Sequence, residues 1–311
     1  MENRTLPGTS GIAVSVVGMG CLPFGLMIDQ PQVDAVVNAS LDAGITFFDT
    51  ADIYGGPHGQ GEEVLAAALG TRINDVVIAS KFGAQHRHEG GGGRRGAGEA
   101  DAVRGYAEDS LRRLGRDHID LYQVHFPDPA TPIDETLEAL DGLVQSGKVR
   151  AIGCSNFAAW QLVDAAWTSQ VNGWAPFVSA QNRYSLLSRE IERDLLPAAK
   201  AKDVAILPYF PLESGLLSGK YTRGQKAPEG TRLATWGGFA DDAKMEKVEQ
   251  IEAALPGVSI LQVAMGWLAA QDGVVSVIAG ATKPEHVAAN VEAAAWRPTA
   301  EQALLIDELT A

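Results

Sequence analysis

Residues 43–55 read AGITFFDTADIYG, and this stretch contains the pattern that decides the fold. Asp42-Ala43-Gly44 has the form of a helix end, with glycine just beyond the last helical residue. The short apolar run Ile45–Asp49 follows at once and ends in an acidic side chain. A helix, a tight turn and a short buried strand in succession are typical of an α/β protein.

Similar short apolar runs recur outward from this stretch in both directions. They are apolar on both faces, as strands of a buried parallel sheet are. The predicted strands are Val14–Met19, Ile45–Asp49, Val76–Ser80, Ile119–Val124, Val149–Gly153, Phe177–Gln181, Val204–Tyr209 and Val274–Ala279. Amphipathic stretches typical of helices lie between them, at Val33–Ala43, Glu62–Leu69, Ala100–Leu114, Ile133–Gln145 and Glu190–Lys202.

Eight such strands predict a single (β/α)8 TIM barrel domain over residues 1–311. We expect a small hairpin over residues 1–13, with its turn at Pro7-Gly8. Two long loops are predicted, at 83–99 and at 211–238, the second lying before the last strand. The second loop concentrates positive charge, which favours phosphate binding; its basic residues are Lys220, Arg223, Lys226 and Arg232.

Composition limits the kinds of molecule that this protein is expected to bind. The formal net charge of −14 argues against nucleic acid or an anionic membrane as the main partner. No apolar run approaches the roughly 18 residues that span a bilayer. The first ten residues lack the apolar core of a signal peptide, so we expect a cytoplasmic protein. Cys21 and Cys154, with no CxxC pair, are too few for a disulfide framework or a cysteine zinc site, and no metal is expected.

Four polar residues follow or end predicted strands. Asp49 ends one strand, Lys81 and His125 follow two others, and Tyr54 lies in the loop after Asp49. At one barrel mouth we expect Asp49 to pair with Lys81, and Lys81 to lie beside the Tyr54 hydroxyl, because a lone buried charge is costly. A phenol has a pKa of about 10, and a nearby ammonium eases its proton exchange. This set suits protonation of a carbonyl oxygen while a hydride reaches the carbon.

Seven motifs carry a more specific resemblance. They are GITFFDTADIYG (44–55), ASK (79–81), LYQVH (121–125), IGCSNF (152–157), QNRY (181–184), Pro211-Leu212 leading to GLLSGKY (215–221), and GATKPE (280–285) with Asn290. In this order and spacing the chain resembles the aldo-keto reductases, including bacterial enzymes and potassium-channel beta subunits, over essentially its whole length. The resemblance implies an oxidoreductase that reversibly reduces an aldehyde or ketone to an alcohol, with a nicotinamide cofactor as hydride source.

The resemblance also implies residue roles. Asp49, Tyr54, Lys81 and His125 would be catalytic, with Tyr54 as proton donor. Phe126 and Trp236 would line the substrate pocket, and Phe239 is a further candidate. NADP(H) would be favoured, with NAD(H) possible. Its binding residues would be Gly20, Cys21, Asp49, Ser155, Asn156, Gln181, Tyr209, Phe210, Pro211, Leu212, Ser214, Gly215, Leu217, Lys220, Arg232, Gly280, Thr282, Lys283, His286 and Asn290.

The chain departs from the family pattern in two places. Family members often have serine where this chain has Phe210. Many have lysine and arginine at the positions of Gly280 and His286, which weakens the usual contacts to a 2′-phosphate, although Lys283 can substitute.

Three alternative functions are weighed against this one. A Rossmann dehydrogenase would need G-x-G-x-x-G after its first strand, whereas Gly18–Pro23 has proline near the third glycine. A Schiff-base aldolase would use Lys81. A cofactor-binding, redox-sensing or accessory subunit with little turnover would share the same motifs. Borohydride trapping on Lys81 would identify an aldolase, and cofactor binding without turnover would identify a sensor.

Overall fold

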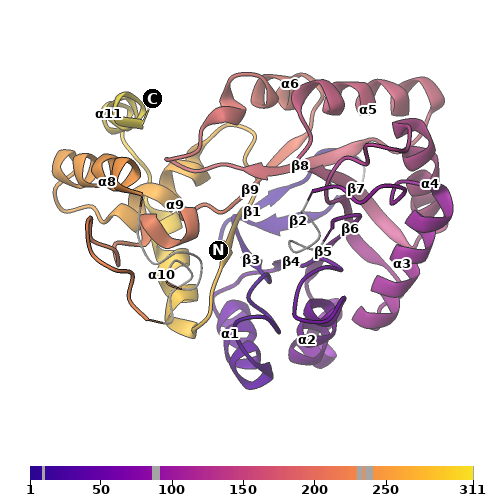
Figure 1. Ribbon diagram of the computed structural model, residues 1–311, viewed down its shortest axis with the longest axis horizontal. Coiled ribbons are helices and arrows are strands. Elements are labelled where there is room, and N and C mark those ends of the chain that lie inside the picture. Colours follow the sequence, from indigo (N-terminus) through magenta and orange to yellow (C-terminus); the bar gives the residue numbers. More distant parts are fainter. Residues whose placement is uncertain (9–10, 86–91, 230–233, 235–240, 311) are drawn as a thin grey trace.

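The computed structural model describes residues 1–8, 11–85, 92–229, 234 and 241–310. Eight parallel strands close into a barrel, each hydrogen-bonded to the next along the chain (Figure 1). They are β3 (Val17–Gly20), β4 (Phe47–Asp49), β5 (Val77–Phe82), β6 (Ile119–Val124), β7 (Val149–Ser155), β8 (Phe177–Arg183), β9 (Ala205–Tyr209) and β10 (Val277–Gly280). Strand β10 closes the ring against β3. The predicted barrel is confirmed.

The first predicted strand is divided between two sheets. Ala13–Ser15 forms β2, which pairs antiparallel with β1 (Asn3–Thr5), and only Val17–Gly20 joins the barrel. The chain bends at Val16, where the Ser15 hydroxyl donates to the carbonyl oxygen of Val17 and accepts from the Thr46 amide. The predicted N-terminal hairpin is therefore present, but its second arm extends two residues beyond the predicted end.

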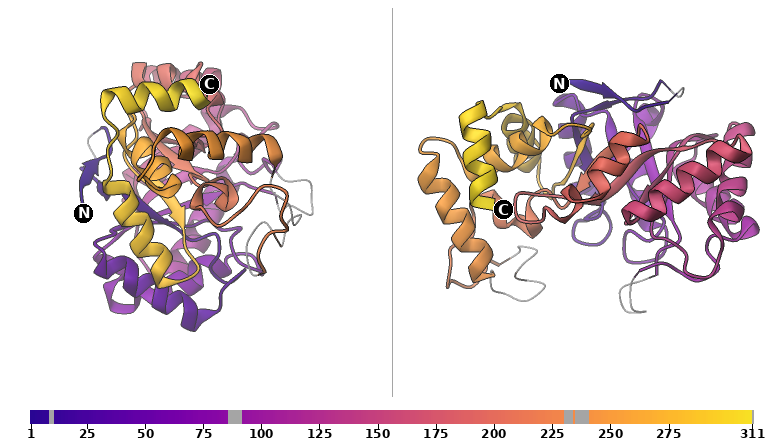
Figure 2. Two further views of the ribbon diagram at one scale, coloured as in Figure 1. Left: turned by 90° about the vertical axis from the view of Figure 1, so that its left-hand side faces the viewer. Right: turned by 90° about the horizontal axis from the view of Figure 1, so that it is seen from above.

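The hairpin covers one end of the barrel. Leu6, Ile12 and Val14 are buried in one hydrophobic cluster with strand residues such as Phe47 and Leu121. In Figure 1 the hairpin lies behind the ring of strands, and in the right-hand view of Figure 2 it lies at the upper edge, beside the N-terminus. The opposite end of the barrel, where the strands finish, is left for the site.

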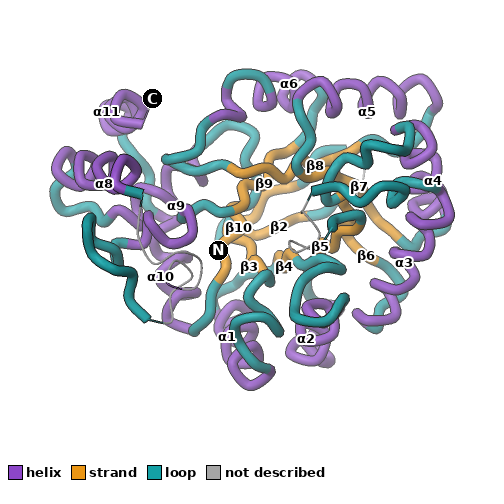
Figure 3. Tube along the Cα trace, in the orientation of Figure 1, coloured by secondary structure: helices purple, strands orange, loops and turns teal. Residues whose placement is uncertain are grey.

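Helices surround the strands, as Figure 3 shows. They are α1 (Gln30–Asp42), α2 (Gln60–Leu69), α3 (Ala100–Leu114), α4 (Ile133–Gln145), α5 (Ala159–Asn172), α6 (Leu195–Ala201) and α10 (Pro284–Ala295). A large apolar cluster fills the space between these helices and the strands. The bounds of α3 and α4 are those predicted. The helix predicted over Glu190–Lys202 is instead a 3₁₀ turn (Glu190–Glu192) followed by α6, because proline at 197 is tolerated only in the first turn of a helix.

The long connection between β9 and β10 contains elements that the sequence analysis does not assign. The short 3₁₀ segment η4 (Glu213–Ser218) follows β9, and α8 (Asp242–Ala254) and α9 (Ile260–Ala270) precede β10. Helix α11 (Ala300–Thr310) packs against α8. Eight of the eleven residues of α9 are buried, so its sequence is apolar nearly all round and lacks the periodicity of a surface helix.

Candidate active site

The four predicted catalytic residues meet at the barrel end where the strands finish. Asp49 is the last residue of β4, His125 directly follows β6, and Tyr54 lies in the loop between β4 and α2. Lys81 lies within β5 rather than after it, one residue before the strand ends at Phe82. The extended strand carries the lysine side chain into the barrel, where it is fully buried.

The Lys81 ammonium group has three oxygen partners. Its Nζ donates to Asp49 Oδ2 at 2.7 Å, to the carbonyl oxygen of Thr50 at 2.8 Å and to Tyr54 Oη at 3.3 Å. The predicted contacts of Lys81 with Asp49 and Tyr54 are therefore present. An ammonium group has three donors, so each N–H has an acceptor and the orientation of the group is fixed.

Burial is the largest single influence on the pKa of Tyr54 and of Lys81. It raises the pKa of Tyr54, and although Lys81 opposes the shift, Asp49 adds to it, so the phenol is protonated near neutrality. The prediction from the sequence considered only Lys81, whose charge lowers the pKa of Tyr54, whereas the net shift of that pKa is upward. Burial lowers the pKa of Lys81, but Asp49 and Tyr54 outweigh burial and leave that pKa above its usual value. The lysine is therefore a cation.

His125 lies at the edge of the same group. Its ring meets the Tyr54 ring edge-on at a centroid distance of 5.9 Å and stacks on Phe126 at 5.2 Å. Burial, followed by the Lys81 charge, places its pKa well below the usual value, so the imidazole is neutral. Among the described residues its Nδ1 has no hydrogen-bond partner.

A second polar network adjoins the first. Gln181 Nε2 donates to Asp49 Oδ1 at 2.7 Å, so both carboxylate oxygens of Asp49 accept hydrogen bonds. The Asn156 side chain donates to the carbonyl oxygen of His125, and its Oδ1 accepts from Tyr209 Oη at 2.7 Å. Asn156 has a φ of +61°, a conformation that asparagine tolerates better than most residues. Strands β4, β7, β8 and β9 are thus connected at one polar surface.

This surface is the floor of a cavity of about 680 Å³. The cavity is lined by Asp49, Tyr54, His125 and Phe126, and by most residues of the predicted cofactor set: Gly20, Ser155, Asn156, Gln181, Tyr209, Phe210, Pro211, Leu212, Ser214, Gly215, Lys220, Gly280, Thr282, Lys283, His286 and Asn290. Lys81 lies buried beneath this floor. Cys21 and Leu217 are also fully buried and do not line the cavity. Arg232, Trp236 and Phe239 lie outside the described residues.

The cavity has nine further lining residues that the sequence analysis does not predict. They are Leu22, Pro23, Met27, Ser218, Glu229, Leu261, Ile278, Ala279 and Ala289. Leu22, Pro23 and Met27 belong to the loop after β3, and in this fold the loops after the barrel strands build the active site. Their position just after the first predicted strand was the sequence signal that could have identified them as lining residues. Leu261 could not be found in this way, because it lies in a helix that was not predicted.

The far end of the cavity is basic. Lys220, Lys283 and His286 line it together with Thr282, whose hydroxyl lies 3.4 Å from His286 Nδ1. Helix α10 begins here with Pro284 in its first turn, so its free amides and positive dipole end lie beside the two lysines. Burial and the lysine charges lower the pKa of His286. This end of the cavity suits an anionic group.

The segment η4 is anchored to the barrel by one carboxylate. Glu213, 3% exposed, accepts hydrogen bonds from Arg183 at the end of β8, from Ser185, and from Lys244 of α8 at 2.9 Å. Burial opposes ionisation, but Arg183 and Lys244 outweigh it and lower the pKa of Glu213 to about 2. Glu213 and Ser214 both have positive φ, so the backbone of this segment is strained and relies on these contacts.

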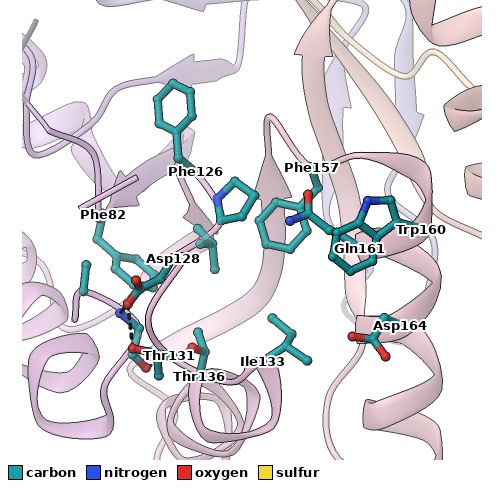
Figure 4. A pocket seen from close by; sticks show the side chains of 15 residues that line it. Phe82, Phe126, Asp128, Thr131, Ile133, Thr136, Phe157, Trp160, Gln161 and Asp164 are labelled. Atoms are coloured by element: carbon teal, nitrogen blue, oxygen red, sulfur yellow. Dashed lines mark hydrogen bonds between the residues drawn. The ribbon is translucent and has the colours of Figure 1, made fainter. Parts of the chain in front are cut away.

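A smaller cavity of about 170 Å³ lies between the first turns of α4 and α5 (Figure 4). Phe82, Phe157 and Trp160 supply aromatic walls, and Asp128 and Asp164 supply carboxylates. Phe126 lines this cavity and the larger one. The ring that stacks on His125 therefore contributes to both.

A buried carboxylate pair lies behind the site. Asp52 is 2% exposed, and within the described part of the chain its Oδ1 has no hydrogen-bond partner. Glu62 is ion-paired with Arg113 at 2.6 Å and accepts from the Ser80 hydroxyl. Burial, followed by the Glu62 charge, raises the pKa of Asp52 to about 8. Asp52 is therefore mostly protonated near neutral pH.

Comparison with known proteins identifies the class. The family model described as the aldo/keto reductase family matches residues 16–311, and the chain belongs to this family of oxidoreductases. The family acts on small-molecule carbonyl substrates with a nicotinamide cofactor. Across residues 1–8, 11–85, 92–229 and 241–310 no group of histidine, cysteine and carboxylate side chains could hold a metal ion. In the same residues no helix is long and apolar enough to cross a membrane.

Particular relatives include both enzymes and a channel subunit. The chain is 35% identical to the uncharacterized oxidoreductase YrpG of Bacillus subtilis, over 93% of this chain and 90% of that protein. It is 34% identical to a probable voltage-gated potassium channel subunit beta of Oryza sativa, with coverages of 94% and 91%. The solved structure of aldo-keto reductase AKR11C1 from Bacillus halodurans (holo form) superposes with a TM-score of 0.80 at 30% identity, covering 100% of this chain and 97% of that one.

Proposed function

We propose that this protein reduces an aldehyde or ketone to an alcohol, reversibly, with NADP(H) or NAD(H), and that Tyr54 exchanges the proton. The observation that carries the proposal is the Lys81 ammonium group, which is held by Asp49 and Thr50 and donates to Tyr54 Oη at the floor of the large cavity. A phenol hydrogen-bonded to a fixed cation can lose its proton to a substrate oxygen, because the phenolate that remains is stabilised at once.

The cavity fits an extended dinucleotide. Amide and hydroxyl groups of Ser155, Asn156 and Gln181 line one end, where a carboxamide would bind, and the aromatic ring of Tyr209 is nearby. Lys220, Lys283 and the start of α10 line the other end, where phosphate groups would bind. When bound, the nicotinamide would supply the hydride equivalent to the carbonyl carbon.

The protein residues would act on the carbonyl oxygen. Tyr54 Oη transfers its proton to this oxygen as negative charge develops there, and Lys81 Nζ then donates a hydrogen bond to the phenolate. Asp49 keeps Lys81 charged and in place. The neutral imidazole of His125 donates a hydrogen bond to the same oxygen and so orients the substrate beside Phe126.

The Tyr54→Phe substitution tests this assignment. It removes the hydroxyl and keeps the ring, so we expect carbonyl reduction to fall by about 10²–10⁴-fold, the usual contribution of a general acid. Cofactor affinity, measured by quenching of protein fluorescence with NADPH, should stay within about threefold. Near-native turnover of the variant with a panel of aldehydes and ketones would exclude Tyr54 as the proton donor.

The second candidate is a cofactor-binding accessory subunit with little turnover. The similarity to a probable potassium channel subunit beta favours it. The two functions separate in one experiment. Oxidation of bound NADPH under single-turnover conditions with excess aldehyde supports the enzyme, whereas tight binding without oxidation across the panel supports the accessory role.

A further inference from the structure

We propose that Asp52 is a positioning residue for Tyr54. While its carboxyl group is uncharged, the loop between β4 and α2 stays packed against β5. When this group ionises, the loop opens and moves the Tyr54 hydroxyl away from Lys81. The inference rests on the proposed role of Tyr54 as proton donor, and it adds a group behind the site that controls the geometry of that donor.

The loop that carries Tyr54 is attached through the backbone of Asp52. The Asp52 amide donates to the carbonyl oxygen of Lys81 at 3.1 Å, and the Asp52 carbonyl oxygen accepts from the Gly59 amide. The Tyr54 carbonyl oxygen accepts from the Gly61 amide at 2.8 Å. Lys81 therefore contacts this loop twice, through its backbone at Asp52 and through its ammonium group at Tyr54. A shift of Asp52 is expected to reach the phenol two residues later.

The loop packs too closely to absorb such a shift. A Cβ atom added to Gly61 would lie 2.8 Å from Tyr54 Cβ, and one added to Gly59 would clash with the Arg113 side chain. The loop backbone therefore lies directly against its own end and against α3, without space for a further side chain. Displacement at Asp52 is passed along the backbone, because no gap takes it up.

The balance of buried charge favours a neutral Asp52. The Lys81 cation is already paired with Asp49 at 2.7 Å. The Arg113 cation is paired with Glu62 at 2.6 Å. Asp52, 2% exposed, is a further carboxyl group beside these two ion pairs, and its Oδ1 has no hydrogen-bond partner among the described residues. A charge on it would be buried without a matching cation, which is costly.

Several titratable and charged groups face Asp52. They are His58 of the same loop, Lys81 of β5, Glu62 of α2, Tyr106 and Arg113 of α3, and Tyr122 of β6. His58 Nε2 lies 3.8 Å from Asp52 Oδ2, and its side chain is 43% exposed, so it lies between the carboxyl group and solvent. An imidazole is ordinarily uncharged above about pH 8, so it supplies no balancing cation in the alkaline range.

Ionisation of Asp52 would set two like charges close together. The Gly59 amide donates to the Asp52 carbonyl oxygen, and the Gly59 carbonyl oxygen accepts from the Glu62 amide, so one residue links the two acids. Burial, followed by the Glu62 charge, raises the pKa of Asp52 to about 8 against the smaller effects of Arg113 and Lys81. Above this pH, repulsion and the need for water should pull Asp52 out of the cluster and open the loop.

The dependence of kcat/KM on pH tests the proposal. With a pKa of about 8, only about one tenth of parent molecules keep the Asp52 proton at pH 9, so kcat/KM should fall about tenfold between pH 7 and pH 9. Asp52→Asn has the same shape and cannot ionise, so its kcat/KM should not follow this fall. The matched control is Glu63→Gln, an exposed carboxylate of the same helix as Glu62, which should keep the parent's profile.

Hydrogen exchange measures the loop without any turnover. Followed by mass spectrometry and corrected for the intrinsic rate, amides of residues 50–61 should lose protection above about pH 8 in the parent and keep it in Asp52→Asn. Glu62→Gln gives a second test. Because this change frees Arg113 to pair with an ionised Asp52, the loop should stay closed at pH 9.

The outcomes separate this inference from the proposed function. An alkaline fall in kcat/KM that Asp52→Asn leaves unchanged would overturn the role of Asp52, as would loop protection that stays constant from pH 7 to pH 10. Loss of protection in the parent but not in Asp52→Asn, without turnover of any carbonyl compound, would support the opening of the loop and refute the proposed reduction.

Discussion

Lys81 determines the geometry of the site, because one buried ammonium group orients a carboxylate, a backbone carbonyl and a phenol. We expect Lys81→Met, which keeps the stem, to lose activity at least 100-fold. It should also reduce the free energy of unfolding by about 3–5 kcal/mol, because Asp49 is left as a buried charge without its cation. Denaturant unfolding and the reduction assay measure the two effects.

The double variant Asp49→Asn with Lys81→Met distinguishes the effect of the unpaired Asp49 charge from the effect of losing the lysine itself. It should recover part of the lost stability but none of the activity, since the stranded charge is gone and the phenol still lacks its cation. If Lys81→Met were as stable and as active as the parent, the Asp49–Lys81 pair would contribute neither to stability nor to activity.

Much of the site at this scale could be predicted from the sequence. Asp49, Tyr54, Lys81 and His125 stand near predicted strand ends, and parallel strands bring their ends to one place. The direction of the Tyr54 pKa shift could not be predicted, because it depends on how deeply the ring is buried. The protonated state of Asp52 depends in the same way on Glu62, whose position follows only from the packing of α2.

At the scale of elements, the start of α10 determines cofactor choice in the proposed function. Lys283→Ala should raise the KM for NADPH about tenfold and that for NADH less, because only NADPH has a 2′-phosphate for the lysine to contact. A charge-assisted contact is worth about 1.5–3 kcal/mol, and exposure removes part of this. His286→Arg should shift preference toward NADPH.

Steady-state kinetics with both cofactors measures these shifts. Lys226→Ala is the control, since this exposed lysine of the connection between β9 and β10 does not line the cavity. Equal effects of Lys283→Ala on the two cofactors would show that the lysine does not contact the 2′-phosphate.

Elements differ in how well their sequences identify them. Helices α3 and α4 have polar outer faces and apolar inner faces, and their predicted bounds match the structure. Helix α9 is buried on nearly all sides, so its sequence has no periodic signal. The hairpin strand β2 continues into β3 as one apolar run, and only the hydrogen bonds of Ser15 separate the two.

For the whole molecule, Asp52 links stability to pH. Burial and Glu62 raise its pKa from 3.8 to about 8, so between these values the native state holds a proton that the unfolded chain has lost. The free energy of unfolding should therefore fall as pH rises across this window, by up to about 1.4 kcal/mol per pH unit. Asp52→Asn should remove this slope and be more stable than the parent above about pH 8. Urea unfolding at several pH values measures the slope, and an unchanged slope would contradict the assignment.

The closure of the barrel by β10 on β3 has a consequence for protein synthesis. The two strands are separated by most of the chain, yet they share one ladder of hydrogen bonds. A nascent chain that has left the ribosome only as far as β9 exposes unpaired edges on β3 and β9, and such edges recruit other chains. The α10 end of the cavity does not yet exist at that stage. Emergence of β10 and α10 from the ribosome therefore both protects the sheet edges and completes the basic end of the cavity.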